Sequence, residues 1–520
     1  MNIDIYDTTL RDGSQAENVA FSLEDKIRIT RELDELGIDY IEGGWPGSNP
    51  KDVEYFDRLK NESLSHAKPA SFGSTRHIKN PPEEDPNLNA LLESQTPVVT
   101  IFGKSWPLHV KDALGVELEE NLDMISSSVD YIQSEGREVI YDAEHFFDAY
   151  VENPDYAMKT VHRAQEAGAD CICLCETNGG RLPQEVRQIV ESVSSEVTTQ
   201  IGIHAHNDGG LGVANSLDAV ESGASHVQGT INGFGERCGN ADLSAIIPNL
   251  ELKMDHHTIG SKKLKGLRKS SLFVSELANL TPDHRKPFVG ESAFAHKGGI
   301  HVTANRRKQE TYEHKKPELV GNSRRILVSE LSGKSNVMQK AEELDLDLDE
   351  DPAKAREVVN EIKKLENKGY QYEAAEGSFQ ILVNRLMDRH EVYFTLEGFR
   401  VVTDQSEDGS PRSEATIRVE VGDRVEHTAA DGVGPVNALD HALRKALNEF
   451  YPELEEVRLT DFKVRVLDET AGTEAKVRVL VEMADSEESW GTVGVSDNII
   501  EASWQALTDG IDYKLMKTRD

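Results

Sequence analysis

Two histidines, His204 and His206, are the residues of this 520-residue chain that point most directly to chemistry. They lie at the end of a short apolar segment that begins at Ile201 and is typical of a β-strand. Residues two apart in a strand project from the same face, so both imidazoles could bind one cation. A histidine pair in a strand more often serves only packing. The position decides between the two interpretations, because active sites lie at the carboxyl ends of barrel strands.

Other polar residues follow other predicted strands, and the same edge of a barrel would collect them: Asp12, Glu144, Thr177 and Asn240. One carboxylate, two imidazoles and an amide oxygen form a mixed nitrogen and oxygen ligand set. Such a set suits Mg²⁺, Mn²⁺ or Zn²⁺ and leaves positions open for water and substrate. The lack of thiolate ligands argues against a purely structural zinc site.

Arg11 precedes Asp12 and is the only basic residue of this early loop. A guanidinium presents a planar fork of donors that suits a carboxylate or a developing enolate oxygen. The alternative is a surface arginine paired with a nearby acid. Gln15 lies four residues further on and could add a hydrogen bond to the same substrate.

Eight short apolar runs alternate with amphipathic helical stretches over about the first 250 residues, as a (β/α)₈ TIM barrel requires. The predicted strands are Ile3–Tyr6, Tyr40–Gly43, Ala70–Ser74, Val98–Phe102, Val139–Ala143, Cys171–Cys175, Ile201–Ala205 and Val227–Ile231. Ser22 predicts a capped helix start, and Gly37 a left-handed helix end. An open doubly wound sheet is the competing fold, but no Gly-rich phosphate loop follows the first strand.

We predict three parts: a catalytic barrel over residues 1–255, a polar helical linker subdomain over 256–389, and an α+β domain over 390–520. The last part repeats internally, because residues 415–421 resemble residues 475–481 at an offset of 60. A duplicated ββα unit can pack as one pseudo-symmetric domain. It carries no evident catalytic cluster, so binding or dimerisation is its expected role.

The composition of the chain argues against some classes of binding partner. The formal net charge is −36, which repels nucleic acid and anionic membranes and also fits a high-salt habitat. No apolar run is long enough to cross a bilayer, and the N-terminus has no signal-peptide pattern. Four cysteines, three of them at Cys171, Cys173 and Cys175, are expected to be reduced and buried. A cytoplasmic enzyme with neither nucleic-acid nor membrane partners is the expectation.

Several motifs together resemble the DRE-TIM metallolyase superfamily. They are Asp7–Gly13, the His204/His206 pair and Gly235–Asn240. Three further segments resemble its Claisen-condensing branch, which joins acetyl-CoA to 2-keto acids, and most resemble the members that act on pyruvate: Glu42–Pro50, Tyr141–Phe147 and Leu319–Arg325. The resemblance runs essentially end to end and includes an allosteric C-terminal domain.

The resemblance implies a site and a mechanism. Asp12, His204 and His206, with Asn240, would hold a divalent metal, Mg²⁺ or Mn²⁺ or else Zn²⁺. Arg11 would stabilise the developing oxyanion, while Gln15, Glu144 and Thr177 would place pyruvate. His301 and Tyr312 of the linker would assist deprotonation of acetyl-CoA, His301 less securely because His296 lies nearby. A homodimer and feedback inhibition by isoleucine are also implied.

Three alternatives remain open from the sequence. An isopropylmalate or homocitrate synthase would use the same chemistry on a larger keto acid, although the bulky loop at Trp45 favours a small one. A 3-hydroxy-3-methylglutaryl-CoA lyase-like enzyme would cleave a C–C bond, but a simple lyase would not need an effector domain. A non-catalytic amino-acid sensor is disfavoured by the intact set of Arg11, Asp12, Glu144, His204 and His206.

Overall fold

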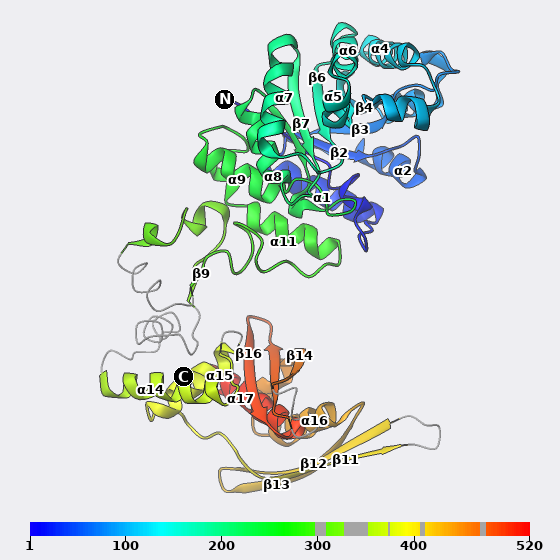
Figure 1. Ribbon diagram of the computed structural model, residues 1–520. Helices are drawn as coiled ribbons and strands as arrows, with labels where there is room; N and C mark the ends of the chain where they lie inside the picture. Colours follow the sequence, from blue (N-terminus) through cyan, green and yellow to red (C-terminus); the bar gives the residue numbers. More distant parts are fainter. Residues whose placement is uncertain (297–307, 327–351, 373–374, 406–410, 468–474, 520) are drawn as a thin grey trace. The chain divides into compact units, whose positions relative to one another are not determined.

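The computed structural model describes residues 1–296, 308–326, 352–372, 375–405, 411–467 and 475–519 (Figure 1). Contacts divide the chain into two units. The first comprises Met1–Phe294 with Lys315–Arg324, and the second comprises Ala295–His314 with Arg325–Asp520. Within the described residues, no helix has the length and apolar character needed to cross a membrane.

The first unit contains a closed barrel of eight parallel strands in sequential order. The strands are β1 (Asp4–Asp7), β2 (Tyr40–Gly44), β3 (Lys68–Ser74), β4 (Val98–Lys104), β5 (Glu138–Glu144), β6 (Cys171–Glu176), β7 (Gln200–Ala205) and β8 (His226–Gly229). All eight correspond to predicted strands, and no end is shifted by more than two residues. The TIM barrel expected from the alternating pattern is therefore confirmed.

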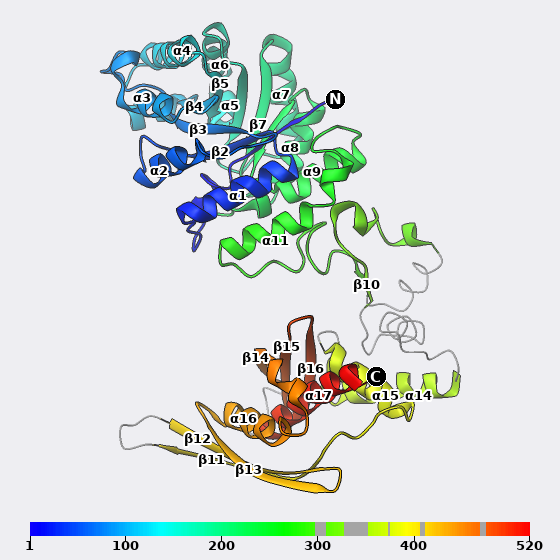
Figure 2. The same cartoon turned by 180° about the vertical axis from the view of Figure 1, so that it is seen from behind.

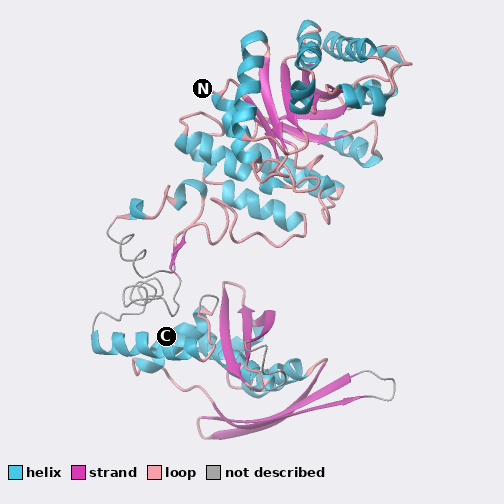
Figure 3. Cartoon of the chain, in the orientation of Figure 1, coloured by secondary structure: helices cyan, strands magenta, loops and turns pink. Residues whose placement is uncertain are grey.

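Helices lie outside the strands, as Figures 2 and 3 show from two sides. They are α1 (Leu23–Leu36), α2 (Pro50–Leu59), α3 (Pro86–Glu93), α4 (Leu118–Ser134), α5 (Phe146–Glu152), α6 (Pro154–Glu166), α7 (Pro183–Glu196), α8 (Gly212–Glu221), α9 (Leu243–Lys253), α10 (Ser261–Leu264) and α11 (Leu267–Leu277). Ser22 caps α1 by accepting a hydrogen bond from the Asp25 backbone N–H, as predicted. Gly37 ends this helix in the left-handed region, at φ 93°.

One layer of the barrel interior is mostly apolar. It consists of buried, mostly apolar side chains from neighbouring strands, namely Tyr6, Tyr40, Ala70, Val98, Ile140, Cys171 and Cys173. The cysteines are free thiols, and all three of strand β6 are buried, as predicted. Because this layer fills the interior with apolar groups, polar side chains gather toward the carboxyl ends of the strands.

The second unit contains two three-stranded antiparallel sheets, each followed by a helix. The first repeat is β11 (Thr395–Gln405), β12 (Pro411–Val421), β13 (Arg424–Gly432) and α16 (Pro435–Leu447); the second is β14 (Arg458–Val466), β15 (Val477–Ala484), β16 (Ser489–Ser496) and α17 (Ile499–Arg519). The duplication predicted from residues 415–421 and 475–481 is present. Each repeat has one strand more than the predicted ββα unit. In the first repeat, the sequence did not reveal β11, because this strand is largely exposed and lacks a regular alternation of apolar residues.

Two helices that precede these sheets in the chain pack with them. They are α14 (Pro352–Asn367) and α15 (Glu376–Leu386). The Ser378 hydroxyl of α15 donates to Asp509 at 2.7 Å and accepts from the Val493 backbone N–H at 3.0 Å. The second unit also includes a short parallel pair, β9 (Ala295–His296) and β10 (Arg325–Ile326). The boundary predicted at residue 390 therefore falls within this contact unit.

The turn after β1 is organised by a buried carboxyl group, Asp7. It accepts hydrogen bonds from the backbone N–H and the hydroxyl of Thr9, at 2.9 and 2.8 Å. The Thr9 hydroxyl oxygen in turn accepts from the Ile231 backbone N–H at 2.9 Å. This chain fixes the start of the loop that carries Arg11 and Asp12. Burial raises the pKa of Asp7 to about 7, although the hydrogen bonds from Thr9 lower it.

The raised pKa of Asp7 predicts a pH-dependent contribution to stability. An unfolded aspartate has a pKa near 3.9, so the folded chain holds the extra proton between about pH 4 and 7. Stability is therefore lost as pH rises through this window, by roughly 1–2 kcal/mol between pH 6 and 8. Asp142 and Glu176, whose pKa values are also raised to about 7, add to the loss in the native chain. Urea unfolding should therefore show a loss in Asp7→Asn that is smaller than that of the native chain by the contribution of Asp7. An exposed control, Asp155→Asn, should behave as the native chain; equal pH dependence in Asp7→Asn would contradict the assignment.

Candidate active site and metal centre

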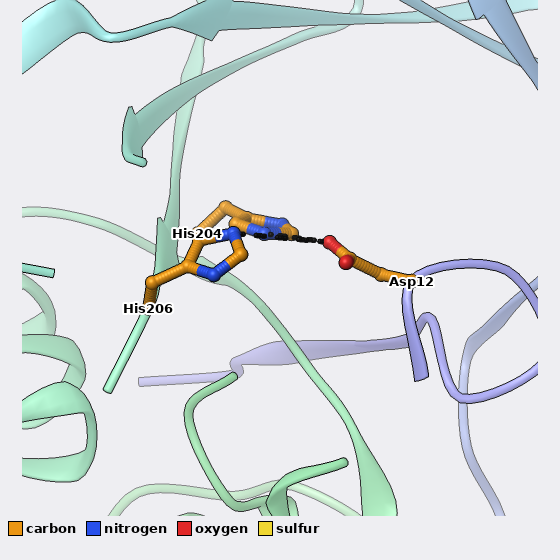
Figure 4. Close-up of side chains that lie close together, drawn as sticks. All are labelled: Asp12, His204 and His206. Carbon is orange, nitrogen blue, oxygen red and sulfur yellow. Dashed lines mark ion pairs between the residues drawn. The ribbon is translucent and has the colours of Figure 1, made fainter. Parts of the chain in front are cut away.

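The predicted metal ligands meet at the carboxyl end of the barrel. Asp12 follows β1, His204 lies on β7, and His206 follows β7 directly. Nε2 of His204 lies 3.3 Å from Oδ2 of Asp12, and Nε2 of His206 lies 3.9 Å from the same oxygen. All three are buried, one ligand atom from each lies within 4.8 Å of the others, and both rings face the carboxylate (Figure 4). The group is consistent with a divalent-metal site.

Asn240 lies at the same point. Its Nδ2 is 3.1 Å from Oδ2 of Asp12 and 3.0 Å from Nε2 of His204. Its Oδ1 is buried without a hydrogen-bond partner among the described residues. A buried amide oxygen without a partner is costly. Rotation of the amide by 180° would exchange its nitrogen and oxygen and direct the oxygen at Asp12 and His204, where a cation would satisfy it. A Cβ at Gly235, where φ is 156°, would lie 1.8 Å from this oxygen, so the approach requires glycine.

The loop that carries Asn240 is tied to the histidine motif. Arg237 donates to both carboxylate oxygens of Asp208, at 2.7 and 2.9 Å. It also donates to the backbone carbonyl of Thr177 at 2.6 Å. The two sequence motifs are therefore joined by an ion pair that orients their ligands.

The charges at the site keep Asp12 ready to bind a cation. Burial opposes its ionisation, but Arg11 and the two histidines hold the pKa of Asp12 well below its usual range. Burial, followed by the neighbouring His204, lowers the pKa of His206 to about 4. For His204, burial acts in the same direction, yet the hydrogen bond and charge of Asp12 raise its pKa. At neutral pH the group therefore offers an anionic carboxylate and a neutral imidazole.

Arg11 is held by a residue that the sequence did not single out for this role, Glu42. Nε of Arg11 donates to Oε1 of Glu42 at 2.8 Å, and Nη2 donates to Oε2 at 3.1 Å. Nη1 lies 3.3 Å from Oδ2 of Asp12, and the guanidinium stacks 3.8 Å above the ring of Phe72. Glu42 is fully buried in the middle of β2. The surface-arginine alternative is therefore excluded, because Arg11 is fixed between the barrel interior and the metal group.

A cavity of about 240 Å³ opens beside these residues. It is lined by all the predicted substrate residues, Arg11, Gln15, Glu144 and Thr177, and by an aromatic wall of Trp45, Phe72 and Phe102. Glu144 pairs with Lys104. The Thr177 hydroxyl oxygen accepts from the His145 backbone N–H at 3.0 Å, which leaves its own proton available to a bound ligand.

A buried relay fixes the orientation of His204. Its Nδ1 lies 2.8 Å from Oε1 of Gln228, and Nε2 of this amide donates to Asp142 at 2.9 Å. The amide oxygen can only accept, so His204 carries its proton on Nδ1 and directs the Nε2 lone pair at the metal site. Burial raises the pKa of Asp142 to about 7. Gln228 was not predicted, because a glutamine in a strand carries no distinguishing sequence signal.

The structure does not test the roles predicted for the two linker residues. His301 lies outside the described residues. Tyr312 belongs to the second contact unit and is 44% exposed. The nearby His296 is buried and lies 3.1 Å from Glu313. The roles of His301 and Tyr312 in deprotonation therefore remain predictions.

Three family models match consecutive parts of the chain. An HMGL-like model covers residues 2–270, a homocitrate synthase post-HMGL domain-like model covers 288–370, and a LeuA allosteric (dimerisation) domain model covers 373–515. The HMGL-like model covers more than half of the chain, so the chain belongs to the HMGL-like family.

Full-length relatives narrow the class. The chain is 56% identical over 519 residues to the (R)-citramalate synthase of Geobacter sulfurreducens, covering 100% of this chain and 98% of that protein. It is 52% identical over 518 residues to that of Aquifex aeolicus, covering 99% and 98%. The 2-isopropylmalate synthase of Methanocaldococcus jannaschii is 32% identical over 518 residues, covering 99% and 95%. The chain belongs to the (R)-citramalate synthase family.

The relay to His204 yields a prediction for metal binding. Gln228→Met keeps the side-chain volume but removes the acceptor that fixes the Nδ1–H tautomer. Mn²⁺ binding, measured by calorimetry on the metal-free enzyme, should weaken roughly 10- to 100-fold. Gln200→Met is the matched control, because Gln200 is partly buried at the opposite end of β7. An unchanged Mn²⁺ affinity in Gln228→Met would show that the ring is oriented without the relay.

Proposed function

We propose that this enzyme condenses acetyl-CoA with pyruvate and hydrolyses the thioester, yielding (R)-citramalate and CoA. The observation that carries the proposal is the meeting of Asp12, His204 and His206 beside Arg11 in one small cavity. The names of the full-length relatives support the product, and the lower identity to the 2-isopropylmalate synthase supports pyruvate over a larger keto acid.

The cavity residues supply binding and charge stabilisation for the keto acid. A divalent cation held by Asp12, His204 and His206, with Asn240, would act as a Lewis acid on the keto group. Arg11, locked by Glu42, faces the position where negative charge develops on the oxygen. Gln15, Glu144 and Thr177 line the same cavity and would place the carboxylate and methyl ends of pyruvate.

A small keto acid suits the aromatic wall. The Trp45 ring meets Phe72 and Phe102 edge-on, with centroids 5.9 and 5.6 Å away. Nε1 of Trp45 donates to Asn87 at 2.8 Å, which fixes the indole. Rigid aromatic rings at these positions limit the volume open to the side chain of the keto acid and favour a methyl group.

A second cavity supports a CoA thioester as the other substrate. It has a volume of about 350 Å³ and shares Phe102 with the first cavity. Its lining includes Lys104, which pairs with Glu144 of the first cavity, so a thioester bound in the second cavity would lie next to the keto acid. Removal of the acetyl methyl proton would fall to His301 and Tyr312, on the resemblance alone, and water would then cleave the thioester.

The ligand set favours Mg²⁺ or Mn²⁺ as the working metal. Carboxylate, amide and water oxygens, with two imidazoles, suit Mn²⁺ and Mg²⁺. Zn²⁺ also binds imidazole, so it remains a competitor at this group.

The C-terminal domain supports two further proposals. Its LeuA allosteric (dimerisation) match supports a homodimer with an amino-acid effector. We propose isoleucine as the effector, because citramalate leads toward isoleucine in the branch that the sequence resembles. The duplicated sheet-and-helix units provide a pseudo-symmetric frame for such a site.

The substrate proposal predicts a clear preference. CoA release should be fastest with pyruvate when pyruvate, 2-oxobutyrate, 2-oxoisovalerate and 2-oxoglutarate are compared with Mg²⁺ or Mn²⁺. His204→Ala should lower the rate more than about 100-fold, because a metal ligand is lost. His162→Ala, on the surface of α6, should leave the rate unchanged. A preference for 2-oxoisovalerate would keep the mechanism and overturn the substrate, whereas no thiol release with any keto acid would overturn both.

If isoleucine binds to the C-terminal domain, it should inhibit the enzyme without competing with pyruvate. Isoleucine should slow CoA release by the full-length enzyme, and its inhibition should persist at saturating pyruvate. Leucine, an isomer with a differently branched side chain, is the matched control and should inhibit less. Inhibition that pyruvate abolishes would place isoleucine in the barrel instead, and the absence of inhibition would reject it as the effector.

A further inference from the structure

We propose that the barrel holds a second cation site, formed by Asp142, Cys173 and Cys175, that takes a thiophilic divalent cation such as Zn²⁺ or Cd²⁺ and inhibits the enzyme. Asp142 lies on β5 and pairs directly with Cys173 of β6 in the barrel sheet. Cys175 lies two residues further along β6, so both thiols project to the same side. One ligand atom from each residue lies within 4.8 Å of the other two, and all three residues are buried.

The donor atoms separate this site from the catalytic one. Two sulfurs and one carboxylate oxygen form a soft set that favours Zn²⁺ or Cd²⁺ over Mg²⁺ and Mn²⁺. The Asp12, His204 and His206 group offers no sulfur. Saturating Mn²⁺ can therefore fill the catalytic group and leave the thiol site open to a softer ion.

A cation can reach this site from the active-site cavity. Asp142 and Cys175 both line the cavity of about 240 Å³, and Cys173 lies behind them. The cavity also offers water as a fourth ligand, which completes a tetrahedral shell for Zn²⁺. The Cys175 thiol lies 3.7 Å from the backbone carbonyl oxygen of Cys173, to which it donates a hydrogen bond. Burial keeps the pKa of Cys173 well above its ordinary value and, against the lowering effect of Cys173, raises the pKa of Cys175 to about 11, so both thiols are protonated at neutral pH. Binding must therefore displace their protons, so only a strongly thiophilic ion competes.

Occupation of this site would disturb the catalytic group. Oδ1 of Asp142 accepts the hydrogen bond from Gln228 that holds the amide against His204. A cation bound to Asp142 competes for the same carboxylate and weakens this hydrogen bond. His204 would then lose its fixed tautomer and orientation, so catalysis would fall without displacement of the catalytic metal.

The test uses the full-length, Mn²⁺-saturated enzyme titrated with Cd²⁺. We expect a thiolate-to-Cd²⁺ charge-transfer band in the ultraviolet that saturates at one equivalent per chain. Between two and three protons should be released near pH 7, one from each thiol and a fraction from Asp142, whose pKa is about 7. The rate of CoA release should fall in proportion to the band. The measurement of CoA release rests on the proposed function, but the absorption and proton measurements do not. A failure of the proposed function can therefore be distinguished from a failure of the proposed cation site.

Cysteine variants provide the controls. Cys173→Ala and Cys175→Ser should each lose the band, and the surviving activity of each should resist Cd²⁺. Cys171→Ala removes a buried thiol of the same strand outside the group, and Cys238→Ser removes the exposed thiol. Both should keep the band and the inhibition. A band that persists in Cys173→Ala and Cys175→Ser, or no band in the native enzyme, would overturn the site; a band without loss of activity would overturn its inhibitory role.

Discussion

Asp12 is a buried carboxylate, and burial alone would keep it protonated and unable to bind a cation. The rest of the site is arranged to prevent this. Arg11 lies against it on one side and the two histidines on the other. Arg11 would itself be costly to bury without a partner, and Glu42 supplies that partner from the next strand. The metal group therefore depends on a chain of charges that crosses three strands of the barrel.

This charge chain is possible because the barrel separates polar from apolar contents. Tyr6, Tyr40 and their neighbours fill one layer with apolar side chains. Several polar groups lie toward the carboxyl ends of the strands, and buried or part-buried hydrogen bonds hold two of them: Arg11 with Glu42, and His204 with Gln228. Low polarity around these pairs strengthens each interaction and fixes the geometry of the ligands.

Asp142 belongs both to the hydrogen-bonded group around His204 and to the proposed thiol site. Its carboxyl group is hydrogen-bonded to Gln228, which holds His204, and it also lies beside the two thiols of β6. The interior of the barrel is close-packed, so a change at one group is passed directly to the next. A cation at the thiols would therefore act on the catalytic metal group through a single shared side chain.

The sequence alone determined the barrel, the duplicated C-terminal units and most residues of the site. Alternating strand and helix patterns are local signals, and active-site residues at the ends of strands follow from them. Asp12, His204, His206 and Asn240 were found in this way. Glu42, Gln228 and the grouping of Asp142 with the thiols were decided only by the tertiary structure. Their roles arise from contacts between strands 24 to 86 residues apart in the chain, as between Gln228 and His204 or Asp142. No local pattern encodes such contacts, because closure of the barrel determines which side chains of different strands face one another.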